Sequence, residues 1–269
     1  MTVVRRERVS ASVVEAYRGT FSQADRPRVV GDELPPAWEG VLFGFAVPLA
    51  DLRPDGTPAR DGILPEIDLP RRMYAGEDSE FYRPLRIGDE VTQTATAGEV
   101  VEKCGSRGRM VFADIVREFH VDGELAVRSI WHDVFLEASD APARPPQRWA
   151  DAAVDTFSDF TLDARQLFRF SALTFNTHLI HYDRRFVREV EGQPDLLVHG
   201  PLTRILLMDA ARRHNPQRTV ADLSVRALAP ILVDQRVRLH AVNEEGRTRV
   251  NALGDDGAIL ARADLRWRG

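Results

Sequence analysis

With 269 residues, of which 43% are hydrophobic and 29% are charged, the chain can form one large globular domain or two of ordinary size. Its net charge of −5 argues against a nucleic-acid-binding protein, which is normally basic. No apolar run approaches the ~20 residues that span a bilayer, and charges interrupt the N-terminus where a signal peptide has its apolar core. The single cysteine excludes an internal disulfide. We therefore expect a cytoplasmic protein that binds neither nucleic acid nor membrane.

The first half of the chain ends in three runs typical of antiparallel strands. Residues 90–103, 109–120 and 124–137 alternate apolar and polar side chains, and glycine-containing turns join them. The segment that follows, residues 138–150, is rich in proline and alanine and poor in large aliphatic residues. We interpret it as a linker between an N-terminal half, residues 1–137, and a C-terminal half, residues 151–269.

The C-terminal half begins with helical sequence. Residues 164–174 predict one short helix, and Asp183 is placed to cap another that runs through Val190. The main helix is predicted over residues 201–214, because Pro201 suits a first helical position and a second proline follows the end. Leucine, isoleucine and methionine cover most of its circumference, so this helix should be largely buried.

Three further alternating runs, residues 235–243, 247–253 and 258–267, predict a second meander of strands. The order of elements therefore repeats that of the N-terminal half. An antiparallel sheet wrapped around a buried helix is a hot-dog unit, and two units in tandem make a double hot dog. The predicted fold class is α+β, with this double arrangement.

Three of the seven histidines fall between residues 178 and 199. Histidine is the only side chain whose unperturbed pKa lies near neutrality, so such a concentration indicates a reaction centre. An alternative interpretation is a metal site, because His178, His181 and Asp183 follow one another in an H-x-x-H-x-D pattern that contains suitable donors.

The runs FSALTFNTHLIHYD, at residues 170–183, and LLVHGPL, at residues 196–202, resemble the MaoC-like hydratase and dehydratase family. They are most similar to its double-hot-dog branch, which contains mesaconyl-C4-CoA hydratases and mitochondrial-type 3-hydroxyacyl-thioester dehydratases. The segments LPPAW, LPRRMYAG and PLRIGD of the N-terminal half also fit, so the resemblance covers roughly residues 30–267. It implies no metal and no cofactor.

The resemblance implies a hydro-lyase that adds water to an enoyl thioester, with Asn176 where the wider family carries Asp. His181 is then the acid and base, because a neutral imidazole can take a proton and return it. Asn176 cannot protonate anything, but its amide can orient the water. Unpaired N–H groups at the start of the main helix, from Gly200 first and Leu202 second, should stabilise the thioester oxygen.

The other candidate residues are assigned to substrate binding. They are His178 and His199, which support the catalytic pair, and three arginines that could hold the phosphates of CoA or of a carrier: Arg71, Arg72 and Arg184. Leu179 departs from the branch, which often has a basic residue there that could hold a free carboxylate. The N-terminal half lacks an Asn and His pair, so we expect it to be non-catalytic and to widen the acyl tunnel.

Three functions are consistent with this pattern. The leading one is an acyl-CoA hydratase whose substrate is branched or dicarboxylic, such as mesaconyl-CoA. The second is a 3-hydroxyacyl dehydratase that acts on carrier-protein thioesters, and the third is a non-catalytic thioester-binding module. The fold would also suit a thioesterase, but no carboxylate is well placed for hydrolysis. A homodimer is expected.

Overall fold

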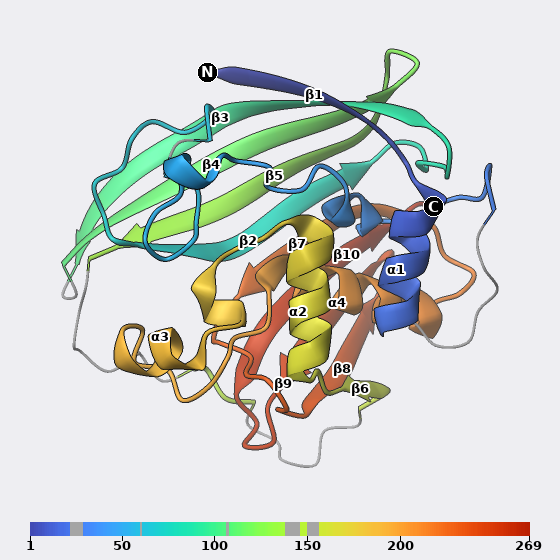
Figure 1. Ribbon diagram of the computed structural model, residues 1–269. Coiled ribbons are helices and arrows are strands. Elements are labelled where there is room, and N and C mark those ends of the chain that lie inside the picture. The colour runs from blue at the N-terminus through green and yellow to red at the C-terminus, as the bar shows by residue number, and fades with distance from the viewer. Residues whose placement is uncertain (22–28, 60, 106–107, 138–145, 150–155) are drawn as a thin grey trace.

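The computed structural model describes the whole chain except residues 22–28, 60, 106–107, 138–145 and 150–155 (Figure 1). The described residues form a single ten-stranded sheet with the strand order β1-β3-β4-β5-β2-β7-β10-β9-β8-β6. Neighbouring strands are antiparallel throughout. The first five strands in this order come from the N-terminal part of the sequence and the last five from the C-terminal part.

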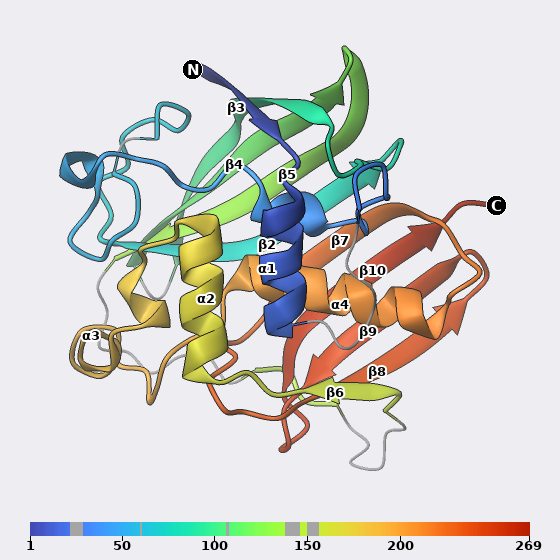
Figure 2. The same ribbon diagram turned by 45° about the vertical axis from the view of Figure 1, so that its right-hand side comes forward.

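The N-terminal strands, in sheet order, are β1 (Thr2–Arg8), β3 (Glu90–Gly105), β4 (Gly108–Val121), β5 (Glu124–Leu136) and β2 (Arg71–Phe81). The C-terminal strands are β7 (Val220–Ala227), β10 (Ile259–Trp267), β9 (Arg247–Leu253), β8 (Val237–Glu244) and β6 (Ser158–Phe160). Strands β2 and β7 pair along the middle of the molecule and so join the two halves into one surface (Figure 2).

The helices lie against one face of this sheet (Figure 1). Among the residues described, no helix combines the length and the apolar character needed to cross a bilayer. The α-helices are α1 (Ala11–Phe21), α2 (Ala164–Thr174), α3 (Arg184–Glu189) and α4 (Gly200–His214). The loops contain three short 3₁₀ helices: η1 (Trp38–Val41), η2 (Leu49–Asp51) and η3 (Leu179–His181).

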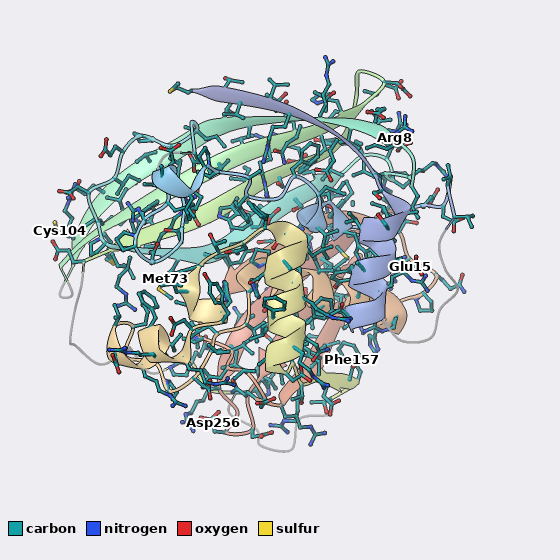
Figure 3. All side chains as sticks on the ribbon, in the orientation of Figure 1. Arg8, Glu15, Met73, Cys104, Phe157 and Asp256 are labelled. Atoms are coloured by element: carbon teal, nitrogen blue, oxygen red, sulfur yellow. The ribbon has the colours of Figure 1, made fainter. Side chains whose placement is uncertain are left out.

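The six predicted meander strands and the three predicted helices are confirmed, with bounds that differ by no more than two residues. Asp163 and Asp183 cap α2 and α3 by accepting backbone N–H groups with their carboxylates. Most of the expected linker, 138–150, lies outside the described residues; within the described part, the Trp149 N–H donates to the Gly257 carbonyl. The lone Cys104 is exposed near the end of β3 (Figure 3).

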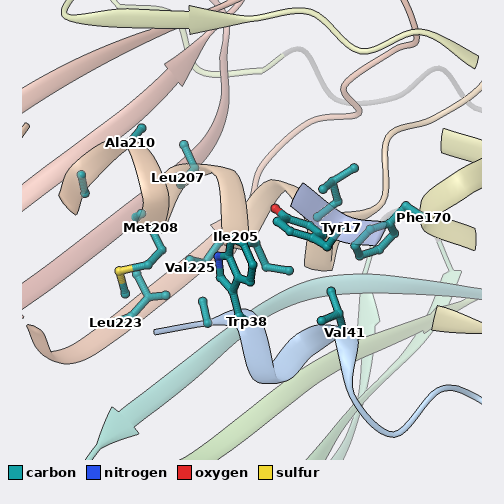
Figure 4. Close-up of a cluster of buried hydrophobic side chains, with 14 of the residues drawn as sticks. Tyr17, Trp38, Val41, Phe170, Ile205, Leu207, Met208, Ala210, Leu223 and Val225 are labelled. Carbon is teal, nitrogen blue, oxygen red and sulfur yellow. The ribbon is translucent and has the colours of Figure 1, made fainter. Parts of the chain in front are cut away.

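Helix α4 is the centre of the core, as the sequence predicted. Most of its apolar side chains are fully buried, and they meet Tyr17 of α1, Trp38 of η1 and Phe170 of α2 (Figure 4). The indole of Trp38 also donates to the carboxylate of Asp209 on α4, at 3.1 Å. Residues from both halves therefore close around one helix.

One charged residue of α4 is buried as deeply as the apolar ones. Arg204 donates to Glu39 Oε1 at 2.6 Å, to Ser79 Oγ at 2.7 Å and to the Ala37 carbonyl at 3.1 Å, and it lies 3.5 Å from Glu77. Burial alone would lower the pKa of Arg204, but Glu77 and Glu39 offset this and raise it above the ordinary value. All of these partners belong to the N-terminal half. The guanidinium thus fixes α4 to η1 and β2.

The burial of α4 predicts a large loss of stability when its contacts are removed. Ile205→Ala should lower the free energy of unfolding by about 2–5 kcal/mol, because the fully buried side chain leaves a cavity. Leu49→Ala, at a site 86% exposed, should change it by less than about 0.5 kcal/mol. Urea titration measures both, and a similar small change in the two variants would contradict the assignment of α4 to the core.

Candidate active site

A cavity of about 310 Å³ lies at the start of α4, where the two halves meet. The C-terminal half lines it with Asn176, His178, His181 and Gly200. The N-terminal half contributes the aromatic walls Tyr74 and Trp131, whose rings pack edge to face at 4.8 Å. The structure thus brings together residues that the sequence analysis predicted and residues that it did not.

Asn176 follows the end of α2, where Phe175 adopts a left-handed conformation and terminates the helix. The backbone N–H of Asn176 donates to the Ser171 carbonyl at 2.8 Å, which fixes the residue in place. Its side-chain Oδ1 accepts the N–H of His178 at 3.0 Å. This hydrogen bond orients the amide of a residue that lines the cavity, and an amide NH₂ group can donate to a ligand.

His181, on η3, has one ring nitrogen committed to the backbone. Its Nδ1 lies 2.8 Å from the carbonyl oxygen of Leu197. A carbonyl can only accept, so Nδ1 carries the proton and the lone pair belongs to Nε2. Burial, with a smaller contribution from His178, lowers the pKa of His181 to about 3. The imidazole is therefore neutral at physiological pH.

The other two histidines surround His181. The ring of His199 stacks on it, with centroids 3.5 Å apart and planes 19° apart, and its Nε2 lies 2.8 Å from Ser171 Oγ. His199 is fully buried, and burial lowers its pKa well below the ordinary value. It lies behind His181 and outside the cavity lining.

His178 lines the cavity, and its ring stands edge-on to that of His181 at 5.6 Å. Its Nε2 is 4.0 Å from Asp55 Oδ2, a carboxylate of the N-terminal half. Burial, and secondarily the charge of Arg72, lower the pKa of His178 to about 3. All three imidazoles are thus held in the neutral form by burial.

The first turn of α4 opens onto the same cavity. Gly200 begins the helix, and the first N–H groups of a helix have no partner within it. A Cβ at Gly200 would lie 2.1 Å from Cδ1 of Tyr74, so only glycine fits against this ring. The side chain of Leu202 is fully buried and lies outside the cavity lining. Any contact that Leu202 makes with a ligand would have to come from its backbone.

The three candidate arginines are in different surroundings. Arg72 lines the cavity, but its guanidinium makes two hydrogen bonds to Asp133 Oδ2, at 2.9 and 2.6 Å. Arg71 pairs with Glu191 at 2.6 Å and Arg184 with Asp195 at 2.8 Å, and neither is part of the cavity lining. Their binding of phosphates stays a prediction.

The loop that carries Asn176 and His181 is held by a segment of the N-terminal half that the sequence analysis missed. The Leu179 N–H donates to the Asp55 carbonyl, and Thr177 Oγ1 donates to the Gly56 carbonyl, both at 2.8 Å. Gly56 has φ +84°, and a Cβ there would lie 1.9 Å from the Thr177 oxygen. The Asp-Gly pair does indicate a turn, but nothing local indicates what the turn packs against.

The H-x-x-H-x-D pattern does not form a metal site in the described residues. Across them, no group of three His, Cys, Asp or Glu side chains is arranged to hold a metal ion. Asp183 instead accepts the backbone N–H groups of Arg185 and Phe186 at the start of α3. The pattern reflects a helix cap that follows two buried histidines.

The chain is similar to known proteins over most of its length. The sequence model of the hydroxyacyl-thioester dehydratase type 2 family matches residues 40–233. A mesaconyl-C(4)-CoA hydratase from Chloroflexus aurantiacus is 36% identical over 88% of this chain and 84% of its own.

Two solved structures from Mycobacterium tuberculosis share the fold. HtdX has a TM-score of 0.74 at 18% identity, with complete coverage of both chains. A conserved protein with a double hotdog fold has a TM-score of 0.58 at 15% identity, with 100% of this chain and 96% of its own covered. The chain therefore has the double hot-dog fold that its order of elements predicted.

The contact between Gly200 and Tyr74 predicts the effect of a single methyl group. Gly200→Ala should destabilise the protein by about 1–3 kcal/mol and reduce activity, because either the ring or the helix start has to move. In a Tyr74→Ala background, Gly200→Ala should lower the free energy of unfolding much less, because the ring that the methyl group would meet is absent. Urea titration measures both changes. An equal loss of unfolding free energy with and without the Tyr74 ring would rule out this contact as the reason why position 200 is glycine.

The buried histidines also predict how stability depends on pH. In the unfolded chain they protonate near pH 6.5, whereas folded His178 and His181 remain neutral down to about pH 3. The unfolded chain then binds more protons between these values, so the free energy of unfolding falls as pH falls. The slope should be about 1.4 kcal/mol per pH unit for each histidine. Urea titrations at pH 6 and pH 5 should show a shallower slope in His181→Gln, and an unchanged slope would contradict the prediction.

Proposed function

Because the chain belongs to the hydroxyacyl-thioester dehydratase type 2 family, we propose that it is a hydro-lyase that adds water reversibly to the double bond of an enoyl-CoA. The observation that carries the proposal is the tautomer of His181. With the proton on Nδ1, the Nε2 lone pair is free to act as a base beside the Asn176 amide and the start of α4. A pure thioester-binding module would need neither group.

The hydration proceeds in two proton transfers. His181 Nε2 takes a proton from water while the water oxygen bonds to the β-carbon, and the electrons of the double bond move to the thioester oxygen. The resulting imidazolium returns its proton to the α-carbon, which restores the thioester and the neutral histidine. Dehydration follows the same steps in reverse.

Asn176 and Gly200 stabilise the reacting groups. The Asn176 NH₂ group donates to the attacking water and orients its lone pair, but it transfers no proton. The Gly200 N–H, at the positive end of the α4 dipole, donates to the oxygen on which negative charge develops. His178 and His199 support His181 by contact and stacking. All of these residues belong to residues 151–269, and residues 1–137 form part of the cavity wall.

The substrate class follows from the relatives. The relative that is 36% identical is named for mesaconyl-C(4)-CoA, so this thioester is the first to be tested. The family description favours a second candidate, dehydration of a hydroxyacyl thioester, which needs the same residues. We take this thioester to be a 3-hydroxyacyl group on a carrier protein. Activity on carrier thioesters with none on CoA thioesters would favour the second candidate.

We further propose that the protein is cytoplasmic and forms a homodimer. Size-exclusion chromatography with light scattering tests the oligomeric state.

His181→Ala provides the test of the mechanism. Loss of the acid and base should lower kcat by at least about 100-fold for crotonyl-CoA and mesaconyl-C4-CoA, followed as loss of enoyl absorbance. His120→Ala, in strand β4 of the other half, is the matched control and should retain wild-type turnover. Activity of His181→Ala within a few-fold of wild type would refute the assignment.

A further inference from the structure

A second cavity, of about 200 Å³, lies between the strands of the N-terminal half and the end of α2. Strands β1, β3, β4 and β5 form one wall, and the segment between η1 and η2 lies against them (Figure 1). This cavity shares wall residues with the candidate active site: Phe45, Pro58, Arg72, Trp131, Asn176 and Pro201. An acyl group bound beside Asn176 would therefore have its far end next to this second cavity.

Three arginines line the second cavity: Arg72, which is bound to Asp133, and the pair Arg5 and Arg117. The first of this pair has only neutral hydrogen-bond partners. Arg5, on β1, donates to the Gly44 carbonyl at 3.0 Å and to Gln93 Oε1 at 2.8 Å. Its Nε is buried without a hydrogen-bond partner among the described residues. Glu7, on the same strand, accepts the Phe43 N–H at 2.7 Å. Its charge raises the pKa of Arg5, but less than burial and the charge of Arg117 lower it.

The second arginine of the pair, Arg117 on β4, has a carboxylate partner that it must share. It donates to Glu77 Oε1 at 2.7 Å, but Glu77 also faces the buried Arg204, 3.5 Å away. The guanidinium of Arg117 lies over the ring of Trp131, 4.8 Å from its centroid, which places it at the wall between the two cavities.

The remaining lining does not neutralise this pair. The carboxylate of Asp61 lies 3.5 Å from Arg72, which also binds Asp133. The other lining side chains are mainly apolar, among them Val3, Leu42 and Ile115. Burial and the charge of Arg117 lower the pKa of Arg5, as expected for two cations close together. An anion bound between them would relieve this repulsion, and arginine binds carboxylates with good geometry.

We propose that Arg5 and Arg117 form a subsite in this second cavity that binds the free carboxylate of the acyl group, and that this subsite makes the protein prefer the monothioester of a dicarboxylic acid. The proposal rests on the proposed function, because it assigns the acyl group to the same continuous site.

Binding of unreactive thioesters tests the proposal independently of turnover. Glutaryl-CoA carries the second carboxylate, and pentanoyl-CoA has the same chain length without it. By isothermal titration calorimetry the protein should prefer glutaryl-CoA, and Arg5→Gln and Arg117→Gln should each lower that preference about 10- to 100-fold. Their affinity for pentanoyl-CoA should stay within about threefold of the wild-type value.

Arg6→Gln is the matched control, because Arg6 lies on the same strand but faces solvent, and it should leave both affinities unchanged. Melting temperatures of all variants show whether they are folded. A wild-type protein with no preference for glutaryl-CoA would overturn the proposal, and so would a preference that survives both arginine substitutions. Failure of the proposed function has a different signature, in which thioesters bind but neither crotonyl-CoA nor mesaconyl-C4-CoA is hydrated.

Discussion

The burial of helix α4 between the two halves is the constraint on which the rest of this structure depends. The helix carries a full positive charge at Arg204, and a buried charge is tolerated only when it is paired and hydrogen-bonded. Glu39 on η1 and Glu77 on β2 are the partners of this charge. If the N-terminal half moved away, Arg204 would be left exposed or buried without a partner. The position of the helix start, where Gly200 meets Tyr74, is thereby fixed from both sides.

The same burial determines the chemistry of the histidines. A dry environment disfavours the imidazolium form, and the Leu197 carbonyl selects the tautomer of His181. The N-terminal half, although it lacks its own Asn and His pair, takes part by holding the loop of Thr177 through the turn at Gly56. Its inner cavity continues the site toward Arg5 and Arg117. In the proposed mechanism, the C-terminal half transfers the protons and the N-terminal half shapes the cavity around them.

Much of this could be predicted from the sequence, because the signals are local. The alternation of apolar and polar side chains predicts the six meander strands. Pro201 and the apolar pattern that follows it predict α4. Strand β2 was missed because its charged residues look exposed, whereas Glu77 is buried against arginines distant in sequence. The roles of Asp55, Arg5 and Arg204 depend on contacts between the halves, and no local pattern specifies those.

The central claim is that His181 is neutral in the folded protein, with its proton on Nδ1. Nuclear magnetic resonance of protein labelled with ¹⁵N-histidine measures both properties, with His181→Gln to assign the signals. The account predicts the Nδ1–H tautomer, with no protonation between pH 8 and pH 5. Protonation of His181 near pH 6.5, or a proton on Nε2 in the free protein, would contradict it.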